Sequence, residues 1–136
     1  MYRVVVAFLL LFSVQASGQD EPDFYTGRTV SILVGSGAGG LTDTSARLIA
    51  RFLERHIPGG PTVIVQNMPG GGGVTMANHV FRSAPRDGTV MGYSSPGMIT
   101  AELLEPNRAK YEGSRLSWIG SAFRSTNTLA VLDTAG

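Results

Sequence analysis

Short apolar runs alternate with polar and glycine-rich stretches along most of this chain. Residues 29–35 form a β-branched, mainly apolar run that stops at glycine, which is typical of a strand covered on both faces. Residues 62–67 and 89–94 have a similar character, and helical periodicity follows the first run and covers residues 74–83. Strand, helix, strand, helix and strand with short connections predict an α/β fold with an open, mainly parallel sheet flanked by helices.

The first predicted helix has an apolar face and a charged face. The apolar face holds Ser45, Ile49, Phe52, Leu53 and His56. The charged face holds Arg47, Arg51, Glu54 and Arg55. We expect Thr42 or Asp43 to be the N-cap, because a short oxygen-bearing side chain accepts hydrogen bonds from the free amides of a first helical turn. The sequence Pro-Gly-Gly-Pro at 58–61 is expected to end the helix.

After residue 94 the periodicity is weaker. A short helix is predicted at 99–104, and strands are predicted at 116–123 and 128–132. Because the chain stops almost directly after the last of these strands, we expect a truncated product or a fragment.

The amino terminus has the pattern of a secretory signal. Residues 4–12 are apolar and follow a single positive charge, and the run is shorter than the ~20 residues needed to cross a bilayer. Small residues follow it, so cleavage between Ala16 and Gly18 and a periplasmic location are expected. The chain is then divided into a signal peptide at 1–18, a leader at 19–28, an incomplete α/β ligand-binding domain at 29–125, and the start of a crossover to a second, missing domain at 126–136.

Composition narrows the possible functions. The formal net charge is +1, which leaves no electrostatic footprint for nucleic acid or for an anionic membrane surface. The chain has no cysteine, no Gly-x-Ser-x-Gly motif and two histidines, His56 and His79, neither of which has a second candidate ligand at helical spacing. We therefore expect a protein, most simply a monomer, that is no enzyme and has no catalytic residues, metal or cofactor.

Two glycine-rich turns, at 35–40 and 68–73, each lie between a predicted strand and a predicted helix. In a parallel sheet such turns meet at the carboxyl edge, where free amides and helix N-termini favour an anion. A carboxylate could be held there without any arginine. Asp43 beside the first turn is either a simple cap or a residue that orders the loop and accepts from a hydroxyl or water on the ligand.

A dinucleotide-binding domain of an oxidoreductase is the competing hypothesis. Gly35, Gly37 and Gly40 satisfy the G-x-G-x-x-G pattern of such domains. The acidic residue expected at the end of the second strand is absent, since that strand ends in Asn67. A third possibility is a truncated product without function.

Four motifs together, at 34–43, 67–73, 85–88 and 118–120, resemble in order and spacing the receptor family of tripartite tricarboxylate transporters, the Bug or TctC-like proteins. The resemblance covers nearly all of the chain after the signal and corresponds to the N-terminal part of such a receptor. It implies domain 1, here truncated, of a type II periplasmic-binding-protein fold. It also implies capture of a small mono-, di- or tricarboxylate, which is then delivered to membrane transporter subunits.

The resemblance implies that three loops hold the ligand. The residues at the similar positions are Ser36, Gly37, Ala38, Gly39, Gly40, Thr42, Asp43, Asn67, Pro69, Gly70, Gly71, Gly72, Gly73, Ser94, Ser95 and Gly97. Two departures affect ligand identity: Gly35-Ser36 replaces a frequent Pro-aromatic pair, and Leu41 is bulkier than the usual residue before Thr42. Without a second domain the ligand would stay half exposed, so weak binding is expected.

Overall fold

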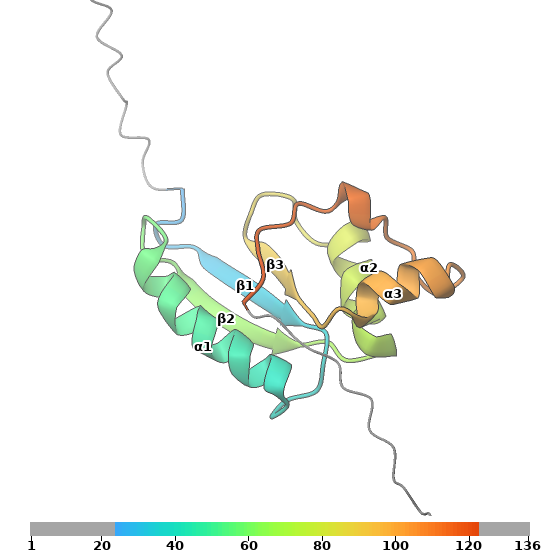
Figure 1. Cartoon of the computed structure of the whole chain (residues 1–136). Helices are drawn as coiled ribbons and strands as arrows, with labels where there is room; N and C mark the ends of the chain where they lie inside the picture. Colours follow the sequence, from blue (N-terminus) through green and yellow to red (C-terminus); the bar gives the residue numbers. More distant parts are fainter. Residues whose placement is uncertain (1–23, 123–136) are drawn as a thin grey trace, which may run out of the picture.

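A computed structural model describes residues 24–122 of the chain (Figure 1). Its elements are, in order, β1 (Thr29–Val34), α1 (Leu41–His56), β2 (Thr62–Asn67), the 3-10 turn η2 (Gly71–Gly73), α2 (Val74–Arg82), β3 (Val90–Tyr93), α3 (Gly97–Leu104) and the 3-10 turn η3 (Gly113–Arg115). The predicted alternation of strands and helices up to residue 104 is confirmed.

The three strands form one open, parallel sheet in the order β2-β1-β3. Val34, the last residue of β1, is in register with Asn67 at the end of β2 and with Tyr93 at the end of β3. All three strands therefore end on one line, and the loops that follow them start from the same edge of the sheet. The predicted α/β class and parallel sheet are confirmed.

Helices α1 and α2 cover opposite faces of this sheet. Ile32 and Val34 of β1 pack with Ala46 and Ala50 of α1. On the other face, a Cβ at Gly92 would lie 2.8 Å from Met76 Sδ of α2. Neighbouring residues of a strand point to opposite faces, so β1 is buried between the two helices, as its continuous apolar run predicted.

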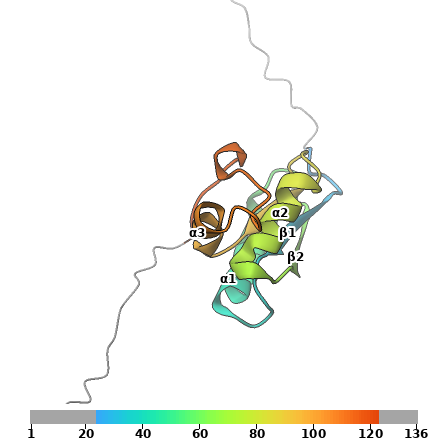
Figure 2. The ribbon, with the colours of Figure 1, turned by 90° about the vertical axis from the view of Figure 1, so that its right-hand side faces the viewer.

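A second apolar cluster lies where α2 packs against α3 (Figure 2). It contains Val74 and Ala77 of α2, Met98 and Ala101 of α3, and Tyr111 from the segment that follows. The Tyr111 hydroxyl donates to the carbonyl of Met98. This cluster fixes α3 and the chain up to residue 111 beside the carboxyl edge of the sheet.

The start of α1 corrects the predicted cap. The helix begins at Leu41, and its N-cap is Gly40, an extended residue that makes no side-chain cap bond. The amide of Thr44 donates to the carbonyl of Gly40 at 2.9 Å, which closes the first turn two residues earlier than a cap at Thr42 would allow. Asp43 therefore lies inside the first turn.

The buried face of α1 matches the predicted apolar face only in part, since Ser45 is buried and Leu53 packs against the cluster of β1 and α1. Ala46 and Ala50 contact the sheet, whereas Phe52 is 56% exposed and His56 lies on the surface. Small alanines let the helix approach the strands closely, so the larger apolar residues around them are left at the margin of the contact.

The segment after η3 corrects one of the two late strands. Residues 116–122 form no strand, because Leu116 packs against the α2–α3 cluster and the Trp118 indole N–H donates to the carbonyl of Gly113. The strand predicted at 128–132, the signal peptide at 1–18 and the crossover at 126–136 lie outside the described residues. Within residues 24–122, no helix is long and apolar enough to cross a membrane.

Candidate functional site

Three loops meet at the carboxyl edge of the sheet: the first loop (36–40), the second loop (68–73) and the third loop (94–96). The strand ladder continues one residue past the ends of β1 and β2, since the Gly35 amide donates to Tyr93 O at 3.0 Å and the Met68 amide donates to Val34 O at 2.8 Å. A Cβ at Gly35 would lie 2.9 Å from both Gly73 Cα and Ser94 Oγ. The end of β1 is thus packed directly between the second and third loops.

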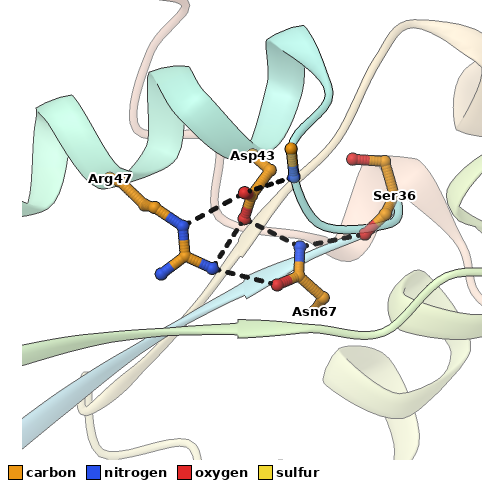
Figure 3. Close-up of polar contacts among 5 residues, drawn as sticks. Ser36, Asp43, Arg47 and Asn67 are labelled. Carbon is orange, nitrogen blue, oxygen red and sulfur yellow. Dashed lines mark hydrogen bonds and ion pairs between the residues drawn. The ribbon is translucent and has the colours of Figure 1, made fainter.

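Asp43 in the first turn of α1 is hydrogen-bonded to the backbone of the first loop (Figure 3). Its side chain is buried, with the residue only 3% exposed. Its Oδ2 accepts from the Gly39 amide at 2.9 Å and from Arg47 Nε at 3.1 Å. Its Oδ1 accepts from Asn67 Nδ2 at 2.8 Å and pairs with Arg47 Nη2 at 2.9 Å. These four contacts match the roughly four lone-pair sites of an ionised carboxylate.

Asn67 joins the first loop to the end of β2. Its Nδ2 also donates to the carbonyl of Ser36 at 3.1 Å, and its Oδ1 accepts from Arg47 Nη2 at 3.1 Å. In Figure 3 the side chains of Asp43, Arg47 and Asn67 therefore form one closed network beside the backbone of the first loop. We call these three residues the polar network.

The polar network keeps Asp43 ionised. Hydrogen bonds from Arg47, from the Gly39 amide and from Asn67 lower the pKa of the Asp43 carboxyl from 3.8 to about 2, against the opposing effect of burial. Because its acceptor sites are filled by the protein, this carboxylate orders the loop, the second of the two roles considered for it. Its direct contact with a ligand stays a prediction.

The second loop is shaped by consecutive glycines. Gly70, Gly71, Gly72 and Gly73 all have positive φ, from 57° at Gly71 to 137° at Gly70. At Gly73 a Cβ would lie 2.1 Å from Ser94 Oγ, and at Gly70 it would lie 2.4 Å from Thr75 Oγ1. Both the backbone conformation and the close approach of neighbouring groups therefore require glycine at these positions.

Unpaired donors remain where the loops meet. Among the described residues, the amides of Gly37, Gly40 and Gly72 have no protein acceptor. The hydroxyls of Ser36 and Ser94 are buried and have no hydrogen-bond partner within residues 24–122. Buried polar groups are normally hydrogen-bonded, so these loops offer a set of donors to an oxygen-bearing guest.

The predicted site residues thus lie at one edge of the sheet. The first and second loops are joined through Asn67, the second and third through Gly73 and Ser94, and a Cβ at Gly97 would lie 3.4 Å from the carbonyl of Gly72. This placement agrees with the predicted convergence of the loops on one crevice. Which of these residues contacts a ligand remains a prediction.

The sequence reasoning missed two arginines at this edge. Arg47 was placed on the charged outer face of the helix, although its position four residues after Asp43 is a typical spacing for an ion pair on a helix. Arg108 lies beside Gly71, where a Cβ would be 2.8 Å from Arg108 Nη2. No periodicity or motif in the sequence signals this second contact.

Metal ligation has no support in the described part of the chain. No group of three or more histidine, cysteine, aspartate or glutamate side chains within residues 24–122 lies close enough together to hold a metal ion. His56, the last residue of α1, contacts the carbonyl of Phe52 through Nδ1 at 2.7 Å, as expected for a histidine at a helix C-terminus.

Comparison with known proteins finds relatives that resemble this chain over part of their length. The chain is 35% identical over 104 residues to the UPF0065 protein in the TAR-I ttuE-ttuC' intergenic region of Agrobacterium vitis, a match that covers 76% of this chain and 29% of that protein. It is 35% identical over 81 residues to protein BugT of Bordetella pertussis, with 60% of this chain and 24% of BugT covered. The chain is homologous to part of the Bug and UPF0065 proteins. This confirms the resemblance inferred from the four motifs.

A third relative is the UPF0065 protein in the gbd 5' region of Cupriavidus necator, 33% identical over 78 residues, which are 57% of this chain and 23% of that protein. The chain thus spans less than a third of the length of each of these relatives. No protein-family model matches the sequence.

Proposed function

We propose that the three loops form one wall of a solute-binding site that captures a small carboxylate-bearing organic anion outside the cytoplasm. The observation that supports this most directly is the convergence of unpaired amides and buried hydroxyls, from Gly37, Gly72, Ser36 and Ser94, at the carboxyl edge of the sheet. We infer that this wall belongs to domain 1 of a type II periplasmic-binding-protein fold.

The donors suit a carboxylate for electrostatic reasons. The first loop leads into the N-terminus of α1, and η2 leads into that of α2, so both helix dipoles place partial positive charge at this edge. Glycines in the second loop leave the backbone open to close approach by a ligand oxygen. Hydrogen bonds from amides to a charged oxygen are about twice as strong as neutral ones.

The buried charge of Asp43 does not repel such a ligand, because Arg47 neutralises it within the polar network. The network holds the first loop through Gly39 and Ser36 O, and the neighbouring amides of Gly37 and Gly40 have no acceptor among residues 24–122. The loop is therefore ordered before any ligand arrives, which lowers the conformational entropy lost on binding.

Capture of the anion without covalent chemistry agrees with the lowered pKa of the Asp43 carboxyl. With a pKa of about 2 and its oxygens already hydrogen-bonded, Asp43 cannot act as a general acid or base near neutral pH. His56 lies at the C-terminal end of α1, away from the loops that precede that helix. We propose that the captured anion is released unchanged to the membrane subunits of a tripartite tricarboxylate-type transporter.

Binding can be tested residue by residue in the ¹⁵N-labelled chain. Titration with succinate at constant ionic strength should shift the amide resonances of Gly37 and Gly72 in a saturable way. Gly88 is the internal control, because it precedes β3 and lies at the opposite edge of the sheet. Sodium chloride at the same ionic strength should leave all three resonances unchanged.

Two results would reject the proposal. If Gly37 and Gly72 do not respond to succinate, acetate or citrate at millimolar concentrations, the loops do not bind carboxylates. If NAD⁺ produces saturable shifts in the first loop and the carboxylates produce none, the G-x-G-x-x-G pattern marks a dinucleotide site instead.

A further inference from the structure

Arg108 lies next to the second loop although it follows α3 in the sequence. A Cβ at Gly71 would lie 2.8 Å from Arg108 Nη2 and 3.7 Å from its Cζ. A shallow cleft joins this guanidinium to the predicted site, and its polar and glycine lining consists of Gly71, Gly72, Gly97, Thr100, Glu105 and Arg108. Three of these six residues belong to the predicted ligand-binding set.

The backbone around Arg108 is fixed on α2 by Asn78. Asn78 Nδ2 donates to the carbonyl of Arg108 at 3.0 Å, and its Oδ1 accepts from the Lys110 amide at 2.6 Å. The Arg108 amide itself donates to Glu105 O at 2.9 Å. The tertiary structure therefore holds the start of this side chain at a constant distance from the second loop.

The guanidinium still has donors to offer. Nη1 donates to the carboxylate of Glu105, whereas Nη2, the nitrogen beside Gly71, has no acceptor among residues 24–122. The two side chains are 60% and 44% exposed, and ion pairs at this level of exposure are easily exchanged. A guanidinium has five N–H donors, so Arg108 can bind a second carboxylate while it keeps Glu105.

We propose that Arg108 is a specificity-determining residue that binds the second anionic group of a solute whose first carboxylate is held by the glycine loops. This inference rests on the proposed function. Arg47, the other arginine at this edge, is already committed to Asp43 and Asn67. Glu105 shares the guanidinium of Arg108 with the ligand, and the negative charge of its carboxylate limits the affinity for a second carboxylate.

The test compares a dicarboxylate with a monocarboxylate in the ¹⁵N-labelled chain. Succinate and acetate dissociation constants are measured from the Gly72 amide for the parent chain and for Arg108→Gln. We expect succinate to bind about fivefold more weakly to the variant, as for loss of one half-exposed charge contact, and acetate to change less than twofold. Arg108→Lys should recover part of the succinate affinity, because it retains the charge but not the planar fork.

Two further variants make the result specific. Arg115→Gln is the matched control, since Arg115 forms the same type of i,i+3 ion pair with Glu112 outside the three loops. This variant should leave the dissociation constants of both succinate and acetate unchanged. Glu105→Gln should strengthen succinate binding about twofold by removing the competing carboxylate. This variant tests the inference even if Arg108→Gln perturbs folding.

The outcomes separate this inference from the proposed function. If the parent chain binds both acids and Arg108→Gln weakens both equally or neither, Arg108 has no role in specificity while the glycine loops remain a carboxylate site. If the parent chain binds neither acid, the proposed function itself fails. A loss of succinate affinity in Arg115→Gln equal to that in Arg108→Gln would also overturn the inference, because it would reflect net charge alone.

Discussion

The first loop and the second loop follow neighbouring strands, yet an added side chain would meet very different surroundings in them. At Gly37 and Gly39 a Cβ would meet nothing within 4 Å. At Gly70 and Gly73 it would lie 2.4 Å and 2.1 Å from the nearest hydroxyl oxygens. The first loop is held from one side by the polar network, whereas the second is held by close packing of its own backbone.

This difference shows that similar glycine-rich sequences can hold their shape by different means. In the first loop, the Asp43 carboxylate accepts from the Gly39 amide and Asn67 donates to the carbonyl of Ser36, so the shape of the loop depends on charge and pH. In the second loop, positive φ angles and tight contacts with Thr75 and Ser94 fix the backbone, so the loop leaves no room for a side chain larger than that of glycine at Gly70 and Gly73. Substitutions that add volume and substitutions that remove hydrogen bonds should therefore separate the two loops.

The largest effect is expected for Gly73→Ala. The new methyl group combines a strained φ of 102° with a clash against Ser94 Oγ, and we expect the free energy of unfolding in urea to fall by about 3 kcal/mol. The double variant Gly73→Ala/Ser94→Ala should have a free energy of unfolding about 1 to 2 kcal/mol higher than Gly73→Ala, because the clashing hydroxyl is removed while the backbone strain remains. A double variant no more stable than Gly73→Ala would show that close packing does not decide the shape of this loop.

Asn67→Ala should have the next largest effect. It removes the donor to Ser36 O and Asp43 together with the acceptor of Arg47, and we expect a loss of about 2 kcal/mol in urea unfolding. The control is Gln66→Ala, an exposed neighbour in the same strand that should change stability by less than about 0.5 kcal/mol. Equal effects of the two variants would mean that the polar network does not hold the first loop.

The pH dependence of stability should distinguish the loops next. The folded-state pKa of Asp43 is lowered from 3.8 to about 2, so its stabilising contribution is complete above about pH 5 and is lost as the pH falls from 3.8 through 2. Thermal unfolding between pH 5 and pH 2 should show a smaller loss of stability in Asp43→Asn than in the parent chain.

Asp87 needs a separate control in that experiment. Hydrogen bonds from Thr89 lower its pKa too, so Asp87→Asn should remove another part of the acid dependence. Only Asp43→Asn should abolish the change of the Gly39 amide resonance with pH, because Gly39 donates to Asp43. Identical pH profiles of the parent chain and Asp43→Asn would contradict a charge-dependent first loop.

The smallest effect is expected for Gly37→Ala. Its φ is not in the left-handed region and its Cβ would point into open space, so urea unfolding should change by less than about 0.5 kcal/mol. A loss as large as that of Gly73→Ala would remove the contrast between the two loops.

Much of the fold followed from local patterns. The β-branched run of β1 predicted a strand buried on both faces, and Val30, Ile32, Leu33 and Val34 are all buried. The start of α1 was misplaced because Gly40, an N-cap without a side chain, gives no signal of the kind that Thr42 or Asp43 gives. Its buried face was predicted only in part: Ser45 and Leu53 lie on it, but Ala46 and Ala50 make its closest contacts because alanines pack more closely than the larger apolar residues that dominate a periodicity count.

The candidate site was predictable as a place and less so as a set of interactions. Glycine turns after parallel strands indicated one shared edge, and the structure puts the loops there. The bridge from Asn67 to Asp43, 24 residues apart, and the bridge from Asn67 to Arg47, 20 residues apart, could not be inferred from spacing. They exist because Asn67 of β2 is in register with Val34 of β1 and because α1 packs on the face of the sheet to which Val34 points.

Up to residue 104, the sequence alone determined which segments are strands, helices and glycine loops, because these depend on side-chain shape and periodicity within a few residues. Only the tertiary structure decided which donors in the loops are already used. Hydrogen bonds within the protein fill the acceptor sites of Asp43, and the amides of Gly37 and Gly72 and two serine hydroxyls have no partner in the described part of the chain. The packing of α3 on α2 brings Arg108 to Gly71. Strand register and helix packing decide which of these groups lie within hydrogen-bonding distance of one another, and neither can be inferred from a short segment of the sequence.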